Sequence, residues 1–452
     1  MEIIIVGCGK VGNALARKLI DEEHNITLVD TSAEKIEQIT GELDVMGIVG
    51  NGSSVEVLSE AGTEDADVFI AVTGSDELNL LCCLFAKKLG SCHTVARVRN
   101  PMYSRELEFI KQSLGFSAII NPELATAREI SRLLRFPAAT KIDTFADGRV
   151  DLIKFQISRE HGLDGMQIKD IQQKMGCNIL VCAVERDNDV KIPDGDFTLK
   201  NNDIITFLSE RNDAVDFFDK LKLPTRSVKN SLIVGGGTIG YYLAKDLLEH
   251  NIKVHIVEQD MKRCEELAEM LPEATILHGD GSNRQLLLSE GLPFVESFVP
   301  LTNLDEENVI LTLFARKHSN AKLVTKINRL EFDDVFDSLE IGSVIYPKYI
   351  TCDFIIQHVR ALENESGNNI KTLYRILDDR VEALEFTVQQ PSNATDIPLS
   401  ELSLKQNQLV CCITRGNKVI IPRGNDSIQL GDSVIIVTLE RGLNDISEIV
   451  TG

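Results

Sequence analysis

Four residues near the start of the chain have the types and the spacing that bind a dinucleotide. Gly7, Gly9 and Gly12 form a Gly-x-Gly-x-x-Gly pattern, and Asp30 follows Gly12 by 18 residues. In such a pattern the first glycine permits a tight turn, the second lets a pyrophosphate approach the backbone, and the third lets a helix pack on a strand. The Asp30 carboxylate can accept both hydroxyl groups of an adenine-side ribose. The pattern therefore predicts a nucleotide site.

These residues can act together only if secondary structure holds them in place. The apolar run 3–6 predicts a buried strand, apolar residues at helical spacing predict a helix up to Ile20, and the run 26–29 predicts a second strand that ends at Asp30. The free N–H groups at the start of that helix attract phosphate. Because the strand, the helix and the acid occur in this order, the pattern favours a nucleotide site, with Cys8, Lys10 and Val11 completing the turn.

The same arrangement occurs a second time in the chain. The interval from Gly7 to Gly235 equals the interval from Asp30 to Glu258. Further pairs keep almost the same interval, among them Ile192-Pro193 and Ile421-Pro422. An offset that holds over the full length indicates a tandem duplication. The second glycine turn and its acid comprise Gly235, Gly236, Gly237, Thr238, Ile239, Gly240 and Glu258.

Two further segments, at equivalent positions of the repeat, follow buried strands. Thr73-Gly74 and Thr302-Asn303 end strands at the carboxyl edge of the predicted sheets, where open α/β sheets bind ligands. An alternative interpretation is a strand-to-helix turn in which Asp76 or Asp305 caps the helix. The two interpretations are compatible, because a helix cap and a ligand-binding edge can coincide.

Four other residues are candidates with an open alternative each. Arg97 and Lys326 lie inside apolar strands, where a charge is costly unless it is paired, so each contacts either a bound phosphate or a carboxylate. Asn51 and Asp280 follow the third strands and either line the adenine side of the site or serve only as turn residues.

The acids and the second turn limit the choice of nucleotide. Asp30 and Glu258 both repel a 2′-phosphate, so NADP is disfavoured, whereas NAD(H), ADP and ATP fit equally well. The second turn has three successive glycines, and Pro300 is expected to interrupt the strand before Thr302. Both features predict that the second site binds more weakly or prefers a different nucleotide.

Strands that alternate with helices predict an α/β protein with two Rossmann-like, doubly wound parallel sheets in tandem, each followed by a small α+β lobe. The expected domains are residues 1–136 and 225–362 for the two Rossmann lobes, and 137–224 and 363–452 for the two small lobes. The helices near 124–136 and 349–362 are apolar enough to mediate contact between lobes.

Composition excludes several classes of function. The formal net charge of −22 argues against nucleic acid as a partner and against an anionic membrane surface. The apolar runs are of strand length, and Met1 leads directly into a strand, so we expect a cytosolic chain with neither a membrane span nor a signal peptide. The ten cysteines form no C-x-x-C pattern and are expected to be buried thiols. Neither a catalytic set nor a metal-binding pattern is evident, which argues against an enzyme.

The whole chain resembles the TrkA family, the peripheral subunits of bacterial Trk potassium uptake systems, which carry two tandem RCK (or KTN) units. The resemblance rests on the segments IIVGCGKVG at 4–12, AVTGSDE at 71–77, ARVR at 96–99 and LIVGGG at 232–237, and above all on the duplication.

The resemblance implies a regulatory role. Family members bind NAD(H) or adenine nucleotides and form a homo-oligomeric ring, a dimer or a tetramer, on a potassium-translocating membrane subunit of the TrkH or TrkG type, which places them on the inner face of the cell membrane. Ligand occupancy changes the shape of the ring and so gates transport. Two alternatives to this function are an NAD-dependent oxidoreductase, because the glycine pattern often serves hydride transfer, and a free-standing nucleotide sensor.

Overall fold

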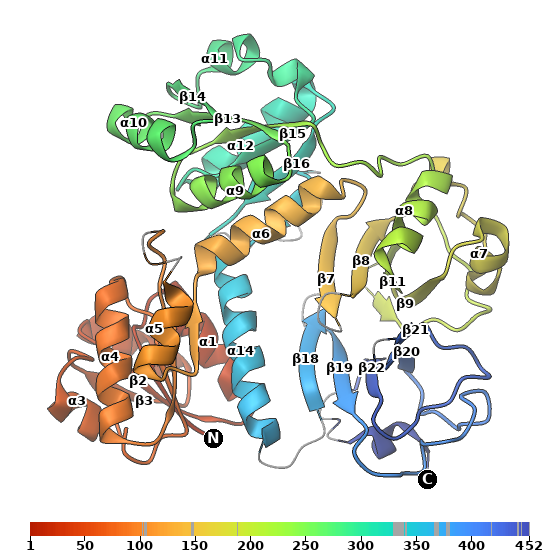
Figure 1. Ribbon diagram of the computed structural model, residues 1–452, viewed down its shortest axis with the longest axis horizontal. Coiled ribbons are helices and arrows are strands. Elements are labelled where there is room, and N and C mark those ends of the chain that lie inside the picture. Colours follow the sequence, from red (N-terminus) through yellow and green to blue (C-terminus); the bar gives the residue numbers. More distant parts are fainter. Residues whose placement is uncertain are drawn as a thin grey trace. The chain divides into compact units, whose positions relative to one another are not determined.

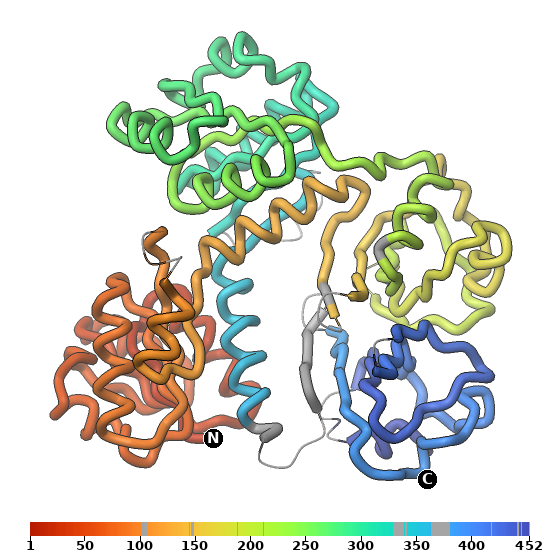
Figure 2. The backbone as a smooth tube through the Cα atoms, in the orientation of Figure 1, coloured from red at the N-terminus to blue at the C-terminus, as the bar shows by residue number. Residues whose placement is uncertain are grey.

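The computed structural model describes residues 1–451 except for positions 102, 104–105, 146–148, 188, 329–338, 340, 366–369, 377–379, 417, 441–442 and 444 (Figure 2). The chain divides into two compact units. Unit 1 comprises Met1–Ser131 and Lys229–Val359, and unit 2 comprises Arg132–Val228 and Arg360–Gly452. Each unit therefore combines one segment from each half of the duplicated chain.

The first lobe of unit 1, drawn in red to orange in Figure 1, contains a six-stranded parallel sheet. The strand order of this sheet is β3-β2-β1-β4-β5-β6. Its central strands are apolar and inaccessible to solvent, as expected for strands that helices cover on both faces. The strand order reverses between β1 and β4, which is where open α/β sheets bind ligands. The strands are β1 (Glu2–Val6), β2 (Asn25–Asp30), β3 (Met46–Val49), β4 (Val68–Ala71), β5 (His93–Arg97) and β6 (Ala118–Ile120).

Helices connect these strands and place their amino ends at the carboxyl edge of the sheet. Basic residues in the last turn of α1 and of α4 complement the negative end of each helix dipole. The helices are α1 (Lys10–Ile20), α2 (Ala33–Glu42), α3 (Val55–Glu60), α4 (Asp76–Leu89), α5 (Leu107–Leu114) and α6 (Pro122–Arg135).

The second lobe of unit 1 repeats this architecture. Its sheet has the order β14-β13-β12-β15-β16-β17, which corresponds strand for strand to the first. The prediction of two tandem Rossmann-like sheets is thus confirmed. The strands are β12 (Asn230–Val234), β13 (Lys253–Glu258), β14 (Thr275–His278), β15 (Ser297–Pro300), β16 (Lys322–Lys326) and β17 (Ser343–Ile345). The helices are α9 (Thr238–Glu249), α10 (Met261–Met270), α11 (Arg284–Ser289), α12 (Asp305–His318) and α14 (Pro347–Glu365).

Pro300 does not interrupt its strand, contrary to the expectation from sequence. It is the last residue of β15 and pairs in register with Val234. The next residue, Leu301, donates its N–H to the Val234 carbonyl oxygen (2.7 Å), as Val72 does to Val6 in the first lobe (2.8 Å). A proline is tolerated here because the ladder needs the donor of the following residue rather than its own.

Two helices of unit 1 contact the lobe of the other repeat. The Ser131 hydroxyl on α6 donates to Asp246 on α9, and just before α6 the Asn121 amide donates to the hydroxyl of Tyr242 on α9 (2.9 Å). In the reciprocal contact, Asp353 on α14 pairs with Lys18 on α1 (2.9 Å). The expectation that these two helices mediate contact between the lobes is therefore confirmed.

Unit 2 contains two small antiparallel sheets of the same topology, with the orders β10-β9-β11-β8-β7 and β18-β19-β22-β20-β21. The strands of the first are β7 (Lys141–Phe145), β8 (Val150–Gln156), β9 (Ile179–Arg186), β10 (Asp189–Lys191) and β11 (Ile204–Ser209), with helices α7 (Ile168–Met175) and α8 (Arg211–Lys220). The strands of the second are β18 (Ile370–Ile376), β19 (Val381–Thr387), β20 (Gln408–Arg415), β21 (Lys418–Ile420) and β22 (Ser433–Thr438).

The two small lobes share one apolar core within unit 2. Cys182 from β9 and Cys411 from β20 both belong to it, at equivalent positions of the repeat, and both thiols are buried. At the margin of this core the Glu185 carboxylate of one lobe accepts from Arg380 of the other (2.7 Å) and pairs with Lys154 of its own (2.8 Å). All ten cysteines are free and buried, so the prediction of buried thiols is confirmed.

Candidate functional site

The first glycine turn joins β1 to α1, and its three glycines have different roles. Gly7 has a φ of +107°, and a Cβ atom there would lie 2.9 Å from the backbone nitrogen of Thr73. A Cβ at Gly12 would lie 1.9 Å from the Gly7 carbonyl oxygen. A Cβ at Gly9 would meet no atom of the described residues within 4 Å. The fold therefore requires Gly7 and Gly12, whereas Gly9 leaves open space that a ligand can approach.

The second glycine turn, between β12 and α9, has the same geometry. Gly235 has a φ of +108°, and a Cβ at Gly240 would lie 2.3 Å from its carbonyl oxygen. A Cβ at Gly237, like one at Gly9, would meet none of the described atoms within 4 Å. Gly236 differs from Cys8, its counterpart, because a Cβ there would lie 2.4 Å from Leu267. The extra glycine therefore makes room for a leucine of α10.

Both turns lead into helices whose first amides are not capped by a side chain. Gly9 is the N-cap of α1 and Gly237 is the N-cap of α9, and neither offers a capping group. The following helix α2, by contrast, is capped by the Ser32 hydroxyl. Uncapped amides and the positive end of the helix dipole favour an anion at both turns. Lys10, Val11, Thr238 and Ile239 form the first turns of these helices.

The two predicted ribose acids lie at the ends of β2 and β13 and bond to the glycine turns. One Asp30 oxygen accepts from the Cys8 N–H (2.7 Å), and one Glu258 oxygen accepts from the Gly236 N–H (2.8 Å). Both carboxylates therefore lie beside the glycine turn of their lobe. Burial, reinforced by the charge of Asp30, raises the pKa of the Cys8 thiol to about 12. This thiol is thus protonated at neutral pH and is not a nucleophile.

A threonine–asparagine pair closes the carboxyl edge in each lobe, and sequence reasoning identified only the threonine. Asn79 Oδ1 accepts from the Thr73 N–H (2.8 Å), and its Nδ2 donates to the Arg97 carbonyl (2.8 Å). Asn308 makes the same bonds to Thr302 (2.9 Å) and Lys326 (3.0 Å). Each asparagine therefore joins the ends of two neighbouring strands. The signal for it was available, since Asn308 stands at the position of the repeat that is equivalent to Asn79.

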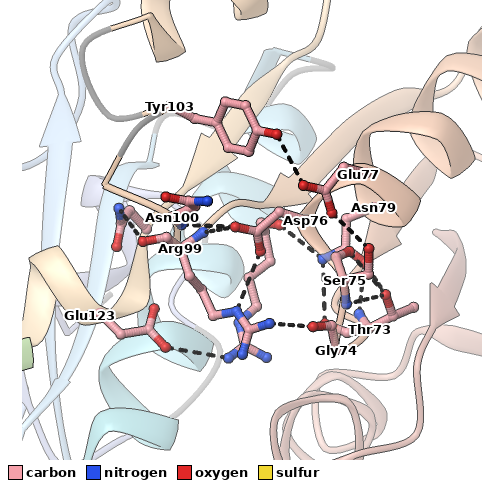
Figure 3. Close-up of polar contacts among 12 residues, drawn as sticks. Thr73, Gly74, Ser75, Asp76, Glu77, Asn79, Arg99, Asn100, Tyr103 and Glu123 are labelled. Atoms are coloured by element: carbon pink, nitrogen blue, oxygen red, sulfur yellow. Dashed lines mark hydrogen bonds and ion pairs between the residues drawn. The ribbon is translucent and has the colours of Figure 1, made fainter. Parts of the chain in front are cut away.

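The first-turn aspartates of α4 and α12 do not cap their helices, contrary to one sequence-based interpretation. Figure 3 shows that Asp76 instead binds the segment after β5, accepting from the N–H groups of Arg99 and Asn100 (both 2.8 Å). The cap of α4 is Ser75. In the second lobe Asp305 accepts from the Asn328 N–H (2.9 Å). A carboxylate inside the first turn can reach the neighbouring strand end, which explains the difference.

Gly74 and Asn303 follow the threonines at this edge. The Gly74 carbonyl accepts from the Arg99 guanidinium (Figure 3), so this backbone group is held by a side chain that also contacts Asp76. Asn303 is exposed. The two lobes therefore differ in the groups that they present after β4 and β15.

Arg97 and Lys326 occupy equivalent positions at the ends of β5 and β16 but have different partners. The Arg97 guanidinium lies 3.5 Å from the Glu123 carboxylate of α6. The Lys326 ammonium donates to the Leu301 carbonyl oxygen (3.0 Å). Of the two alternatives left open by the sequence, Arg97 therefore has the carboxylate partner. Burial lowers the pKa of Arg97, raises that of Glu123 and lowers that of Lys326 to about 8.

Asn51 and Asp280 each follow a residue that is bonded to the backbone of Asp30 or Glu258. The residue before Asn51 donates its N–H to the Asp30 carbonyl (3.0 Å), and the residue before Asp280 donates to the Glu258 carbonyl (2.9 Å). Both side chains also bond locally within their own turns. The turn interpretation and the adenine-side interpretation are thus both compatible with their positions.

The candidate residues consequently lie along the carboxyl edges of two sheets. Among the described residues no group of three or more His, Cys, Asp or Glu side chains could hold a metal ion. No helix in the described part of the chain is both long and apolar enough to cross a membrane.

Two family models match the chain. The TrkA-N domain model matches residues 3–122 and 231–347, and the TrkA-C domain model matches residues 152–222 and 383–451. Each model thus matches once in each half of the duplicated sequence.

Similar proteins match over nearly the full length. The Trk system potassium uptake protein TrkA of Halomonas elongata is 32% identical over 453 residues, which cover 99% of this chain and 98% of that protein. A TrkA homolog of Archaeoglobus fulgidus is 31% identical and is covered completely, with 99% of this chain aligned.

Among solved structures, the GsuK channel has a TM-score of 0.64 at 17% identity, covering 97% of this chain and 76% of the channel chain. The structure of the GsuK channel bound to NAD has a TM-score of 0.62 at 17% identity, with the same coverage of both chains. At this level of identity the similarity supports the fold.

Proposed function

Because this chain belongs to the TrkA family, we propose that it is a regulatory subunit of a potassium uptake system and that it responds to a nucleotide. Relatives that match nearly end to end are named as Trk system potassium uptake proteins. In this proposal the chain acts through binding and shape change rather than through catalysis.

The observation that carries the proposal is the repeated geometry of the two glycine turns. In each, a carboxylate bonds to the second residue of the turn, at 2.7 Å for Asp30 and 2.8 Å for Glu258, beside an uncapped helix end. This combination suits a pyrophosphate and the ribose attached to it. The proposed ligand is NAD(H), with ADP or ATP as alternatives. A 2′-phosphate would meet the negative charge of Asp30 or Glu258, which disfavours NADP.

The proposed partner is a potassium-translocating membrane subunit of the TrkH or TrkG type, on which the chain assembles as a ring of two or four copies at the inner face of the membrane. One solved structure of similar fold is that of the GsuK channel bound to NAD, which supports the pairing of this fold with that ligand and with ion conduction. Gating requires that the ligand binds one shape of the ring more tightly than the other, since a ligand of equal affinity for both would not change their populations.

Calorimetry with NADH, NAD, ADP and ATP on the full chain tests the proposal. We expect wild type to bind at least one of them, Asp30→Ala to lose one class of site, and Glu258→Ala to lose the other. Failure of wild type to bind any, or unchanged binding in both variants, would overturn the proposal. Oxidation of NADH by small carbonyl compounds would instead favour an oxidoreductase.

Partner assignment needs a separate experiment. We expect the chain to copurify with a potassium-translocating membrane protein. If the chain no longer associates with membranes in cells that lack that protein, the complex is specific. A chain that stays free of membrane proteins in native cells would favour a free-standing sensor.

A further inference from the structure

The turn after β3 contains the dipeptide Asn51-Gly52, the only place in the chain where glycine follows asparagine. Asn51 is exposed and lies between β3 and α3, outside both elements. An asparagine in this context can react with its own chain, because the nitrogen of the next peptide group can attack the side-chain Cγ and displace ammonia. A following glycine favours the attack, since it has no side chain to obstruct the approach.

The side-chain oxygen of Asn51 is already bound by two donors. Its Oδ1 atom accepts from the backbone N–H (3.0 Å) and from the hydroxyl (2.9 Å) of Ser53. Attack on Cγ turns this oxygen into an oxyanion, and donors that point at it before the reaction stabilise the charge as it develops. The same two bonds orient the amide, so that Nδ2, the nitrogen that departs, takes no part in them.

The attacking nitrogen has no hydrogen bond to break. The Gly52 N–H donates to no group in the part of the chain that the structure describes. The backbone on either side is held, since the Gly50 N–H donates to the Asp30 carbonyl (3.0 Å) and the Ser54 N–H donates to the Asn51 carbonyl (2.9 Å). The turn therefore keeps its shape while the reacting nitrogen stays available.

The fold requires the glycine and accommodates the product. A Cβ atom at Gly52 would lie 2.3 Å from the Cγ1 atom of Val6, and Gly281, its equivalent in the second repeat, is equally restricted. The residue before Gly281 is Asp280, whose Oδ1 atom accepts from the Ser282 N–H (2.8 Å). The second repeat thus holds, in the same turn, the carboxylate that the reaction creates in the first.

We propose that Asn51 deamidates spontaneously in the folded chain and that Ser53 activates it. The Gly52 nitrogen forms a bond to the Asn51 Cγ atom and loses its proton. The bond from Cγ to Nδ2 breaks, and Nδ2 leaves with that proton as ammonia, which closes a five-membered imide. Water then opens the imide at one of its two carbonyl groups and yields aspartate or isoaspartate. Water is consumed and ammonia released, so the step needs neither an oxidant nor a cofactor.

The two products change the first lobe in different ways. Aspartate adds a negative charge and gives the first repeat the carboxylate that the second repeat has by sequence. Isoaspartate also lengthens the main chain, which disturbs the bond from the Ser54 N–H to the Asn51 carbonyl just before α3. A population of chains therefore separates with time into species of different charge. The reaction needs no nucleotide, so this inference is independent of the proposed function.

The test follows the full chain during incubation at mildly alkaline pH. Mass spectrometry of the peptide that contains residue 51 measures loss of the amide, and an isoaspartyl methyltransferase labels the isoaspartate product. Asn283 is an internal control, because it is also exposed and its Oδ1 atom also accepts from two N–H groups (3.0 and 3.3 Å). The residue after Asn283 is Arg284 rather than glycine. We expect position 51 to lose its amide while position 283 keeps it.

A variant separates the effect of Ser53 from that of the glycine. Ser53→Ala removes the hydroxyl donor and retains the N–H donor, so we expect it to slow the loss of the Asn51 amide by roughly twofold to tenfold. An unchanged rate in this variant would overturn the activation by Ser53. An intact Asn51 in the folded chain, under conditions in which the urea-unfolded chain loses its amide, would mean that the fold protects the residue and that the inference is wrong.

Discussion

The two Rossmann lobes have the same hydrogen bonds between neighbouring strand ends but different charged groups at the edge where a ligand is proposed to bind. Asn79 and Asn308 make the same bonds to neighbouring strand ends, at 2.8 Å and 2.8 Å in the first lobe and at 2.9 Å and 3.0 Å in the second. Arg97 and Lys326, by contrast, have different partners although they occupy equivalent positions. The position of the repeat that is equivalent to Glu123 is occupied by Cys352. Duplication thus preserved the framework of the site and left its charged groups free to diverge.

The small lobes follow the same rule. Arg186 pairs with Asp203 (2.7 Å) and Arg415 pairs with Asp432 (2.8 Å), each pair joining two strands of its own sheet. Glu185 accepts from Arg380 of the other small lobe (2.7 Å), whereas the position of the repeat that is equivalent to Glu185 is occupied by Thr414. The Arg–Asp pairs inside the two sheets are thus repeated, and the bond that Glu185 makes to the other lobe is not.

The largest effect is expected from the glycines that both lobes require for packing. Gly12→Ala would place a Cβ 1.9 Å from the Gly7 carbonyl oxygen, and we expect it to destabilise the chain by about 4 kcal/mol. Gly9→Ala meets no described atom within 4 Å, so it should leave stability nearly unchanged and weaken nucleotide binding. Thermal unfolding and calorimetry on both variants measure the contrast. Similar unfolding temperatures for the two variants would contradict this division of roles.

The next effect concerns Lys326, a buried lysine of the second lobe. The pKa of Lys326 is about 8 in the folded chain against an ordinary 10.5, because burial disfavours its charge. Between these values the unfolded chain binds the proton and the folded chain does not, so stability rises with pH across this window. Below about pH 8 the buried charge costs about 3 kcal/mol.

We therefore expect Lys326→Met to stabilise the chain at neutral pH by up to about 3 kcal/mol and to reduce the rise in stability above pH 8. Urea unfolding at about pH 7 and about pH 10 measures both changes. Arg97→Met, the equivalent change in the first lobe, should give no such gain, since the guanidinium has a carboxylate partner. A rise with pH that persists in full in Lys326→Met would show that another group causes it.

A smaller effect is expected from the ion pair that Arg97 and Glu123 form in the first lobe. The two residues are largely buried, with 16% and 18% of their side chains exposed, so loss of one partner leaves the other poorly solvated. Arg97→Met and Glu123→Met should each destabilise the chain, and the double variant should recover about 1–2 kcal/mol relative to their sum. A double-mutant cycle by urea unfolding measures this coupling, and strict additivity would mean that the pair contributes nothing.

The smallest effect concerns the contact between the lobes. The Tyr242 hydroxyl accepts from Asn121 (2.9 Å) and donates to the Arg99 carbonyl (3.2 Å). Tyr242→Phe should cost about 1 kcal/mol, because both partners are left without this hydroxyl. The matched control is Tyr241→Phe, in the adjacent residue, which should cost less. Equal unfolding midpoints for wild type and Tyr242→Phe would argue against a role for this hydroxyl.

The two Rossmann-like sheets could be predicted from the sequence, because the spacing of apolar residues and the interval between repeated motifs both depend on backbone structure. Glycine spacing, apolar runs and the nearly constant offset between the two halves predicted both sheets, and the TrkA resemblance followed from them. β7 (Lys141–Phe145) escaped prediction because it lies next to the end of α6 and carries polar residues at alternate positions. Pro300 was misjudged because a proline at the last position of a strand costs no ladder bond.

Partners of the polar side chains were harder to predict. One interpretation of the sequence had Asp76 capping α4, but Ser75 takes that role. Two adjacent residues could serve as the cap, and only the fold decides which side chain faces the neighbouring strand. The alternatives for Arg97 stayed open for the same reason, since Glu123 becomes its neighbour only through the pairing of β5 with β6. The sequence shows which polar side chains are present, but the topology of the fold determines which of them lie in contact.

The exchange of α6 and α14 between the lobes limits how this protein could have arisen. Lys18 and Tyr242 each bond to a segment supplied by the other half of the chain. A half-length chain with the same helices would leave those faces of its lobe uncovered unless two copies paired. For the same reason, neither half of the present gene should yield a self-sufficient product when expressed alone.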